Sequence, residues 1–349
     1  MNLDFFESKF KKLAVFLNSK EFLNWHYPIS KIPPNSLEID ITFKCNYDCE
    51  MCPRPRRLPK GELTFSDWQK MMKDPIFIGI KGLCISGGEP FLHPKLLELI
   101  FLFIKSMPNM QSLHINTNGF FTEKIIFLVR TLAPILDKKG IKLSFLVSLD
   151  GIGEKHNNIR RNPQSFYAVE KTISALKLLR EKYIFEFFVN CTLFRKNLHE
   201  ISNIEKWCES QKISFRFNMI NFFDIGFVKN IDKKRELDFR EEDKKYLFKV
   251  LEELSSNNHL VSAVRNYSLE VLRLYKDNAH RITICPFVKN GFRIDPCGNI
   301  YYCFKQNMIG NFLKDRSVSK IFYLPKNLIN RQKIAEETCR YCNAFCRTL

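Results

Sequence analysis

Three cysteines in the segment KCNYDCEMCPR, from Lys44 to Arg54, have the type and spacing of ligands for a metal centre. Cys45, Cys49 and Cys52 follow the pattern C-x3-C-x2-C. A disulfide needs two thiols, and a tetrahedral zinc site usually takes four ligands. In a four-iron cluster each iron takes one outer ligand, so three thiolates leave one iron open to a small chelating molecule. The triplet therefore indicates an iron–sulfur cluster with an open position, and zinc with a fourth ligand from elsewhere is the alternative.

The elements that must position this triplet can be read from the apolar pattern. Runs predicted as strands cover residues 37–43, 82–86, 112–117, 142–150, 185–193 and 213–220, and predicted helices cover 64–73, 95–106, 122–137, 166–183 and 197–210. Six strands separated by helices predict parallel β/α units, as an open sheet or a barrel. In such folds the chemistry lies at the carboxyl ends of the strands. The triplet and the motifs SGGEP, TNGF and SLDG stand at four successive strand ends.

The triplet after the first strand and SGGEP after the second resemble the radical S-adenosylmethionine (radical SAM) superfamily, over roughly residues 37–220. The resemblance implies an α/β fold, a partial (β/α)6 TIM-like barrel, in which the triplet binds a 4Fe-4S cluster and the open iron chelates S-adenosylmethionine. It implies an enzyme of the oxidoreductase or transferase type: an electron cleaves the sulfonium, and the 5′-deoxyadenosyl radical abstracts a substrate hydrogen. A reductant such as flavodoxin or ferredoxin would supply the electron.

The resemblance also assigns expected roles to single residues. Cys45, Cys49 and Cys52 would be the catalytic cluster ligands. The residues expected to bind S-adenosylmethionine are Tyr47, Gly87, Gly88, Glu89, Asn118, Ser148, Asp150, Arg160 and Asn190.

The expected contacts of these residues follow the family pattern. Tyr47 would lie near the adenine, and the GGE motif at Gly87 would meet the methionine amino group. Arg160 would pair with the methionine carboxylate, a task that suits a bidentate guanidinium. Asn157 and Arg161 stand where the family usually has Asp and Gly. For Asn190 a buried asparagine bonded to the backbone is the alternative.

A second group of cysteines lies near the C-terminus and resembles the SPASM/Twitch extension of some radical SAM enzymes, which holds one or two auxiliary 4Fe-4S clusters. Two fully ligated clusters would need eight thiolates, whereas six cysteines lie between Cys285 and Cys346, so one auxiliary cluster is expected and two remain the alternative. The expected ligands are Cys285, Cys303, Cys339 and Cys342; Cys346 could replace one of the last two, serve a second cluster or be spare. Gly298 is expected in a hairpin turn, with Cys297 as a turn residue. A zinc ribbon is the alternative.

The expected organisation has four parts. Residues 1–36 form an N-terminal helical extension, 37–220 the radical SAM core, 221–283 a helical linker region, and 284–349 a small cysteine-rich α+β SPASM/Twitch-like domain. Cys84, Cys191 and Cys208 stand in apolar surroundings and are expected to be small buried side chains.

Composition limits the cellular setting and the partners. The 349 residues carry a net charge of +18, yet long basic runs are absent and the densest is PRPRR, from Pro53 to Arg57. A solvated basic surface and an anionic substrate both fit this charge. No membrane span or signal peptide is recognisable, so a cytoplasmic protein with reduced thiols is expected. No sequence pattern typical of nucleic-acid binding is present.

Two substrate classes remain for an enzyme of this kind. A small, anionic metabolite (a sugar, cyclitol or nucleotide derivative) is favoured, because one auxiliary cluster is expected and the PRPRR loop would suit a phosphate. The alternative is a precursor peptide that is cross-linked, epimerised or oxidised. The roughly 36 residues before the first strand leave no room for the recognition module that peptide-modifying members often carry. A non-catalytic, zinc-containing nucleic-acid-binding protein is the third possibility.

Overall fold

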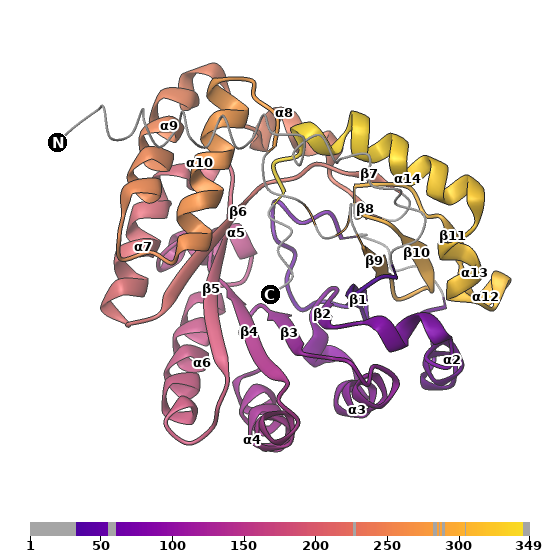
Figure 1. The fold of residues 1–349 in the computed structure, drawn as a ribbon. Coiled ribbons are helices and arrows are strands. Elements are labelled where there is room, and N and C mark those ends of the chain that lie inside the picture. The colour runs from indigo at the N-terminus through magenta and orange to yellow at the C-terminus, as the bar shows by residue number, and fades with distance from the viewer. Residues whose placement is uncertain are drawn as a thin grey trace.

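The structure is a computed structural model that describes residues 33–54, 61–225, 228–281, 285, 287, 290–303 and 305–344. A nine-stranded sheet with the order β11-β10-β9-β1-β2-β3-β4-β5-β6 runs through the molecule (Figure 1). Its strands are β1 (Ser36–Asp40), β2 (Gly82–Ser86), β3 (Ser112–Thr117), β4 (Lys142–Ser148), β5 (Glu186–Leu193), β6 (Ser214–Met219), β9 (Gly291–Ile294), β10 (Asn299–Tyr301) and β11 (Gly310–Asn311).

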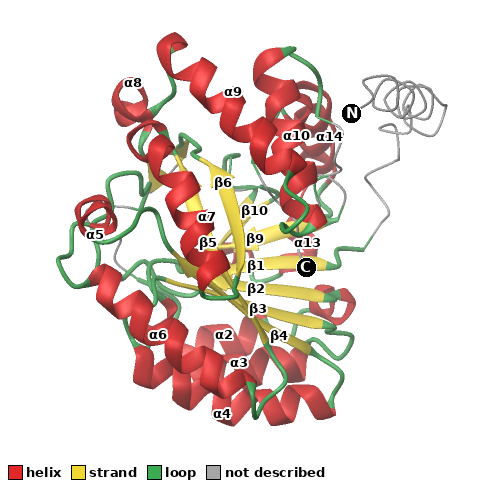
Figure 2. Cartoon of the chain, turned by 90° about the vertical axis from the view of Figure 1, so that its left-hand side faces the viewer, coloured by secondary structure: helices red, strands yellow, loops and turns green. Residues whose placement is uncertain are grey.

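The six strands of the N-terminal half pair in parallel and in sequence order, with helices packed on one face of the sheet. Figure 2 shows α2, α3, α4 and α6 on the same side of these strands. The helices are α2 (Phe65–Met71), α3 (Leu96–Ser106), α4 (Thr122–Lys138), α5 (Glu154–Arg160), α6 (Ser165–Arg180), α7 (Ile201–Ser210), α8 (Lys234–Leu237), α9 (Glu241–Ser256), α10 (Ser262–Lys276), α12 (Phe312–Asp315), α13 (Val318–Phe322) and α14 (Pro325–Glu337). This arrangement is the predicted partial β/α barrel.

Side chains alternate along each strand, and this alternation separates an apolar face from a polar one. In β3 the residues Leu113 and Ile115 are fully buried in the main core, whereas His114 and Asn116 are half-buried on the other face. The apolar face packs against the outer helices. The opposite face, here called the inner face, is therefore free to carry polar chemistry.

The C-terminal strands do not form a sheet of their own. β9 pairs in parallel with β1, in register from Ser36 with Gly291 to Ile39 with Ile294. β10 and β11 then continue the sheet as antiparallel strands. The cysteine-rich region therefore extends the sheet of the barrel, a pairing that the sequence pattern did not indicate.

The region between the two halves is mostly helical, but it begins with a two-stranded antiparallel ribbon, β7 (Asp224–Ile225) and β8 (Val228–Lys229). This ribbon differs from the helical structure expected for residues 221–283. Asn230 explains the difference, because its buried side-chain amide donates to the carbonyl oxygens of Met51 and Asn221. The backbone N–H of Lys229 donates to the Pro53 carbonyl oxygen. The ribbon is thus held against the cysteine loop.

The predicted elements of the core are confirmed with small changes at their ends, and one helix was missed. β2 and β3 cover the predicted residues, while β1 and β4 end earlier. Helix α5 was not predicted. The helical extension expected for residues 1–36 falls mainly outside the described residues.

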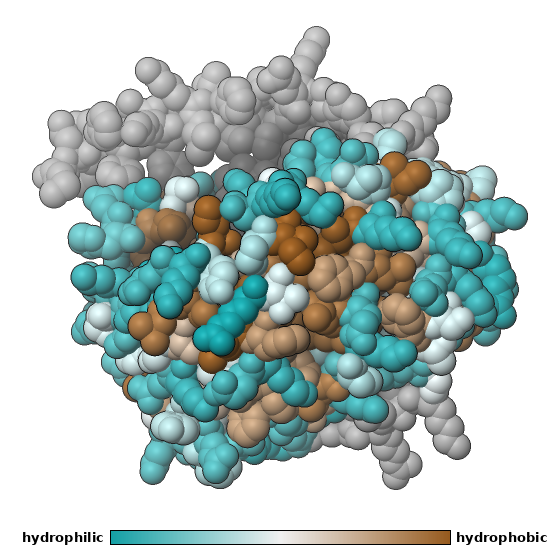
Figure 3. Space-filling view, turned by 90° about the horizontal axis from the view of Figure 1, so that it is seen from below, coloured by the Kyte–Doolittle hydropathy of each residue, from teal (hydrophilic) through white to brown (hydrophobic). Residues whose placement is uncertain are grey.

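No helix among the described residues is both long and apolar enough to cross a membrane. Seen from below, the surface mixes apolar and hydrophilic side chains, with apolar ones gathered near its centre (Figure 3).

Candidate active site

The loop after β1 holds the three cysteines in an apolar setting. Cys49 is buried, and Cys45 and Cys52 are half-buried. Their apolar neighbours are Tyr47 and Met51 of the same loop and four residues from distant parts of the chain: Ile159, Phe194, Ile220 and Leu237. Burial raises the pKa of Cys49 to about 11. Without a metal the Cys49 thiol is therefore protonated at neutral pH.

Two charged side chains fix the path of this loop. The Arg54 guanidinium donates to the carbonyl oxygens of Phe43 (3.3 Å) and Tyr47 (3.0 Å). The Glu62 carboxylate accepts from the Phe43 N–H at 2.7 Å and from the Thr42 hydroxyl. A solvated loop and a phosphate site were both expected for the PRPRR segment, whereas the Arg54 guanidinium is used inside the protein. Residues 55–60, which include the other two arginines, lie outside the described residues.

The loop after β2 approaches the cysteine loop so closely that only glycine fits. A Cβ atom at Gly88 would lie 2.0 Å from the Lys44 carbonyl oxygen, and one at Gly87 would lie 2.4 Å from that of Thr42. Backbone bonds hold the two loops together, since the Gly88 N–H donates to Thr42 (2.7 Å) and the Glu89 N–H to Lys44 (2.8 Å). The two predicted motifs are therefore brought side by side.

Glu89 is buried between the loops that follow β2 and β3. Its carboxylate accepts from the Asn118 N–H (2.7 Å), the Thr117 hydroxyl (2.9 Å) and the Phe91 N–H (3.2 Å). Burial raises the pKa of Glu89 to about 7 although these donors favour the ionised form. Asn118 continues the contact, since its Nδ2 donates to Asn46 Oδ1 at 2.8 Å and lies 4.0 Å from Cys45 Sγ.

The buried Glu89 gives a prediction for the protein without cofactors. A carboxyl whose pKa is about 7 when folded and 4.5 when unfolded stabilises the fold fully below the unfolded value, and this contribution is lost as pH rises toward 7 and above. Glu89→Gln cannot ionise. The free energy of unfolding of the wild type, relative to Glu89→Gln, should therefore fall by about 3 kcal/mol between pH 5 and 8.

Urea unfolding of the two proteins at several pH values measures this difference. Glu98→Gln on α3 serves as the control, because Glu98 is exposed. Its pH profile should follow that of the wild type. Parallel curves for the wild type and Glu89→Gln would contradict the assignment of Glu89 as the titrating group.

Asp150 and Arg160 form a buried ion pair beside Cys49. Arg160 Nη2 lies 2.5 Å from Asp150 Oδ2, with side-chain exposures of 10% and 0%, and Nη1 donates to Cys49 Sγ at 3.7 Å. Burial raises the pKa of Asp150, while the Arg160 guanidinium opposes the rise. Asp150 also accepts from the Thr192 N–H at 2.8 Å. The pair links the SLDG strand end to the cysteine loop.

Helix α5, which the sequence did not predict, carries Arg160 into this position. Arg161 ends the helix in the left-handed conformation, with φ of 54°, at the position where the family usually has glycine. Asn157, which replaces the usual aspartate, accepts through Oδ1 from the Ser165 hydroxyl and the Phe166 N–H.

The last two residues expected to bind S-adenosylmethionine lie on the inner face. Ser148, the last residue of β4, and Asn190, within β5, are in-register neighbours. Asn190 Oδ1 accepts from Asn218 Nδ2 of β6 at 3.1 Å. Its side chain is thus bonded across strands rather than to the backbone.

The structure brings four of the C-terminal cysteines together. Cys285, Cys303 and Cys342 belong to one small apolar cluster together with Phe287 and Ala344. Cys339 begins the short 3-10 turn that leads to Cys342. Burial raises the pKa of Cys339 to about 12.

The other cysteines lie elsewhere. Cys297 is in the turn between β9 and β10, where Gly298 has a φ of 77°, as expected. Cys346 lies outside the described residues. Cys191 and Cys208 are buried as expected, whereas Cys84 is only half-buried, on the inner face.

The inner face carries a row of polar residues, of which the sequence alone singled out only Asn190. In-register neighbours point to the same face, and the pairs Arg293–Glu38, Cys84–His114 and Asn190–Arg216 cross it. Arg293 forms ion pairs with Glu38 and Asp40. The Arg216 guanidinium lies 3.8 Å from the centroid of the Phe188 ring. Period-2 alternation of these polar residues was the only signal that could have found them.

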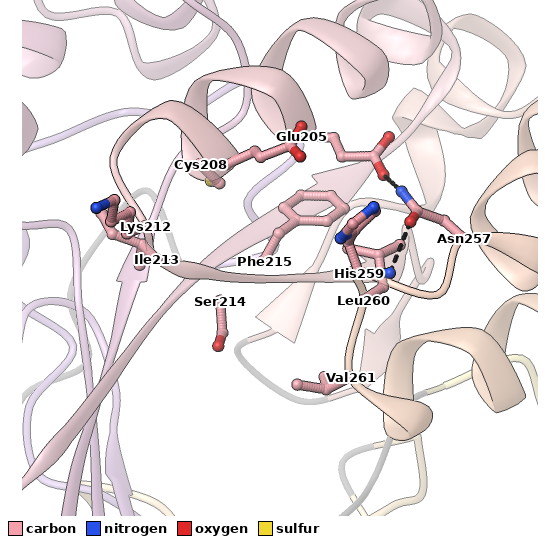
Figure 4. A pocket seen from close by; sticks show the side chains of 11 residues that line it. Glu205, Cys208, Lys212, Ile213, Ser214, Phe215, Asn257, His259, Leu260 and Val261 are labelled. Carbon is pink, nitrogen blue, oxygen red and sulfur yellow. Dashed lines mark hydrogen bonds between the residues drawn. The ribbon is translucent and has the colours of Figure 1, made fainter.

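Two surface pockets do not coincide with the cysteines. One of about 270 Å³ lies where α7 ends and β6 begins, next to the loop between α9 and α10 (Figure 4). In it Asn257 donates to Glu205 at 2.5 Å, and the His259 N–H donates to Asn257. This is the amino end of β6, remote from the strand ends that carry the motifs. The other, of about 400 Å³, lies between the starts of α4 and α6.

The residues around Cys45, Cys49 and Cys52 fit a cluster and S-adenosylmethionine. Three thiols share one loop, and two polar atoms beside them, Tyr47 Oη and Asn46 Nδ2, are buried without a hydrogen-bond partner among the described residues. Such atoms are costly unless a ligand satisfies them. A sheet with this order, with a cysteine triplet and a GGE loop at adjacent strand ends, defines a radical SAM domain.

Comparison with known proteins agrees with this conclusion. The family model described as "Radical SAM superfamily" matches residues 39–208. Residues 39–208 therefore form a radical SAM domain, and the cofactors of that family are a 4Fe-4S cluster and S-adenosylmethionine.

Three curated relatives are named for three different activities. An AdoMet-dependent heme synthase of Methanosarcina barkeri is 30% identical over 48% of this chain and 45% of its own length. A PqqA peptide cyclase of Bradyrhizobium diazoefficiens is 26% identical over 49% and 42%. A GTP 3′,8-cyclase of Listeria welshimeri is 26% identical over 58% of each chain. The chain thus spans about half the length of these curated relatives.

Among solved structures, anSMEcpe with bound AdoMet and the Kp18Cys peptide superposes with a TM-score of 0.62. It is 20% identical, and the match covers 89% of this chain and 86% of that one. This likeness shows that the fold is shared over most of the chain.

Proposed function

We propose that this radical SAM enzyme abstracts a hydrogen from a small, anionic metabolite, such as a sugar, cyclitol or nucleotide derivative, and oxidises or rearranges it. One auxiliary 4Fe-4S cluster, held by Cys285, Cys303, Cys339 and Cys342, would assist. When bound, the first cluster and S-adenosylmethionine supply the hydrogen abstraction. The residues of this chain would hold and orient the substrate and exclude water.

The observation that carries the proposal is the parallel pairing of β9 with β1. The loop after β1 holds the triplet, and Cys303 follows β10, which is the hairpin partner of β9. Both cysteine groups are therefore attached to strands of one sheet. The inner face of that sheet carries the guanidinium groups of Arg216 and Arg293 together with the carboxyl groups of Glu38 and Asp40, a mixed polar lining that suits a richly hydroxylated molecule. The relationship to a GTP 3′,8-cyclase also favours a nucleotide-like substrate.

A precursor peptide is the second candidate. A curated relative is named as a PqqA peptide cyclase, and the solved anSMEcpe structure holds a peptide. A peptide would have to enter the same inner face from the side of the strand ends. Both candidates use the same two clusters and differ in the molecule whose hydrogen is abstracted.

Counting iron and sulfide in anaerobically purified, reconstituted protein tests the cluster part of the proposal. The wild type should bind about eight irons, and the triple variant with Cys45, Cys49 and Cys52 changed to alanine about four. Cys208→Ala is the control and should keep the wild-type count, because Cys208 is buried in α7 away from both groups. About four irons in the wild type and none in the triple variant would contradict the auxiliary cluster. About twelve irons in the wild type and eight in the triple variant would point to two auxiliary clusters.

Formation of 5′-deoxyadenosine then tests the substrate part. The enzyme is incubated with dithionite, S-adenosylmethionine and either phosphorylated sugars and nucleotides or candidate peptides. Stimulation by the small anions, with loss of the reaction in the triple variant, supports the main candidate. Stimulation by peptides alone would replace it with the second.

A further inference from the structure

Two buried arginines, Arg281 and Arg331, pack among the segments that carry the C-terminal cysteines. Arg281 pairs with Glu270 at 3.1 Å, and its Nη1 donates to the Cys342 carbonyl oxygen at 3.4 Å.

Arg331, on α14, is 2% exposed. Its Nη2 donates to the carbonyl oxygens of Phe287 (2.8 Å) and Gly291 (3.0 Å). The guanidinium also lies 4.7 Å from the centroid of the Tyr302 ring.

These contacts join the three segments that carry the four cysteines. Phe287 is two residues after Cys285, and Tyr302 directly precedes Cys303. Helix α14 itself leads into the short 3-10 turn that begins at Cys339. The arginine is therefore placed at the junction of all three segments.

The charge of Arg331 is not balanced by any carboxylate within ion-pair distance among the described residues. Two of its donors, Nε and Nη1, are buried without a hydrogen-bond partner in the part of the chain that the structure describes. A buried cation with unused donors is strongly unfavourable unless an anionic group compensates it. Burial lowers the pKa of Arg331 to about 10, and Cys285 and Cys339 are among the groups that oppose the decrease.

We propose that Arg331 is the buried counter-cation of the cluster held by Cys285, Cys303, Cys339 and Cys342, and that it raises the reduction potential of that cluster. The inference rests on the proposed auxiliary cluster. A cluster with four thiolate ligands is anionic, and it gains one more negative charge when it is reduced. A nearby positive charge with free N–H donors stabilises the reduced form more than the oxidised form. Arg331 is in this sense a positioning and tuning residue, not a catalytic one.

The test uses the full chain with Cys45, Cys49 and Cys52 changed to alanine, so that only the auxiliary cluster can assemble. The protein is reconstituted with iron and sulfide, and the cluster is titrated against potential by electron paramagnetic resonance. Arg331→Met should reduce the fraction of reduced cluster about tenfold at a fixed potential, which corresponds to about 59 mV toward more negative values for one electron. Arg331→Lys keeps the charge and should stay near the parent protein.

Lys333→Met is the matched control. It removes a positive charge from the same helix, but Lys333 is 67% exposed and pairs with Glu337, so water screens it and no shift is expected. If Arg331→Met fails to assemble the cluster, the iron content of Arg331→Gln and Arg331→Lys tests the role of the positive charge instead. Assembly retained by lysine and lost by glutamine supports the counter-cation, whereas loss in both overturns it.

The outcomes separate this inference from the proposed function. A parent protein without about four irons would overturn the auxiliary cluster and the role of Arg331 together. Iron present with an unchanged potential in Arg331→Met would overturn the role of Arg331 alone. An equal shift in the lysine variant would mean that the arginine only shapes the loop.

Discussion

Gly88→Ala is expected to abolish iron binding at the triplet and to lower the free energy of unfolding by about 3 kcal/mol or more. The added Cβ would lie 2.0 Å from the Lys44 carbonyl oxygen and 2.7 Å from that of Phe43, both backbone atoms of the cysteine loop. Backbone atoms cannot rotate away as the end of a side chain can. The two loops must therefore separate, and the bond from the Gly88 N–H to Thr42 is lost with them. Iron content and urea unfolding measure the two effects.

Gly140→Ala is the matched control for this change. Gly140 has a φ of 69°, but nothing lies within 4 Å of the position of its Cβ. The substitution should cost about 1 kcal/mol through backbone strain and leave iron binding intact. If Gly88→Ala bound iron as the wild type does, the close approach of the two loops would not be required for the site.

The second large effect is expected at the ion pair of Asp150 and Arg160. Asp150→Ala leaves the Arg160 guanidinium buried without its carboxylate, and breaking a buried pair in this way typically costs about 3–5 kcal/mol. Arg160 Nη1 also contacts Cys49 Sγ, so the cysteine loop should lose order. Unfolding of the cofactor-free protein and affinity for S-adenosylmethionine, measured on the reconstituted enzyme, report the two consequences.

Two further variants show whether the charge or the volume matters. Glu123→Ala removes one partner of an exposed pair with Lys171, whose side chains are 78% and 52% exposed, and should change stability by less than about 1 kcal/mol. The double variant Asp150→Leu, Arg160→Met should regain much of the stability that Asp150→Ala loses, yet bind S-adenosylmethionine poorly. A double variant as unstable as Asp150→Ala would argue against an uncompensated charge as the cause.

The parts of the fold that are encoded locally could be predicted from the sequence. β2 and β3 are short apolar runs bounded by turns, and the structure confirms their limits. The motifs at the strand ends fall together because parallel strands share one edge. Helix α5 was missed because its seven residues, EKHNNIR, lack an apolar stripe and end in a left-handed arginine rather than a glycine.

The interactions between distant segments could not be predicted in the same way. Nothing in the local pattern of β9 indicates that it pairs with β1. The pairing depends on the free edge of β1, which lies far from β9 in the sequence. Arg54 stands in a basic run that suggested a ligand, yet its guanidinium is used for two backbone carbonyl groups of its own loop. Arg331 had no sequence signal at all, since its role depends on three segments that meet only in the folded chain.

The pairing of β1 with β9 also has a consequence for biosynthesis. β1 is among the first elements to leave the ribosome, but one of its two neighbours, β9, is made only after almost all of the chain. Until then the edge of β1 exposes unpaired backbone groups, which makes a nascent chain prone to pairing with other chains. Contacts so far apart in sequence also slow folding. Truncated chains that end before β9 should therefore aggregate, and chaperones that shield a strand edge should raise the yield of the intact protein.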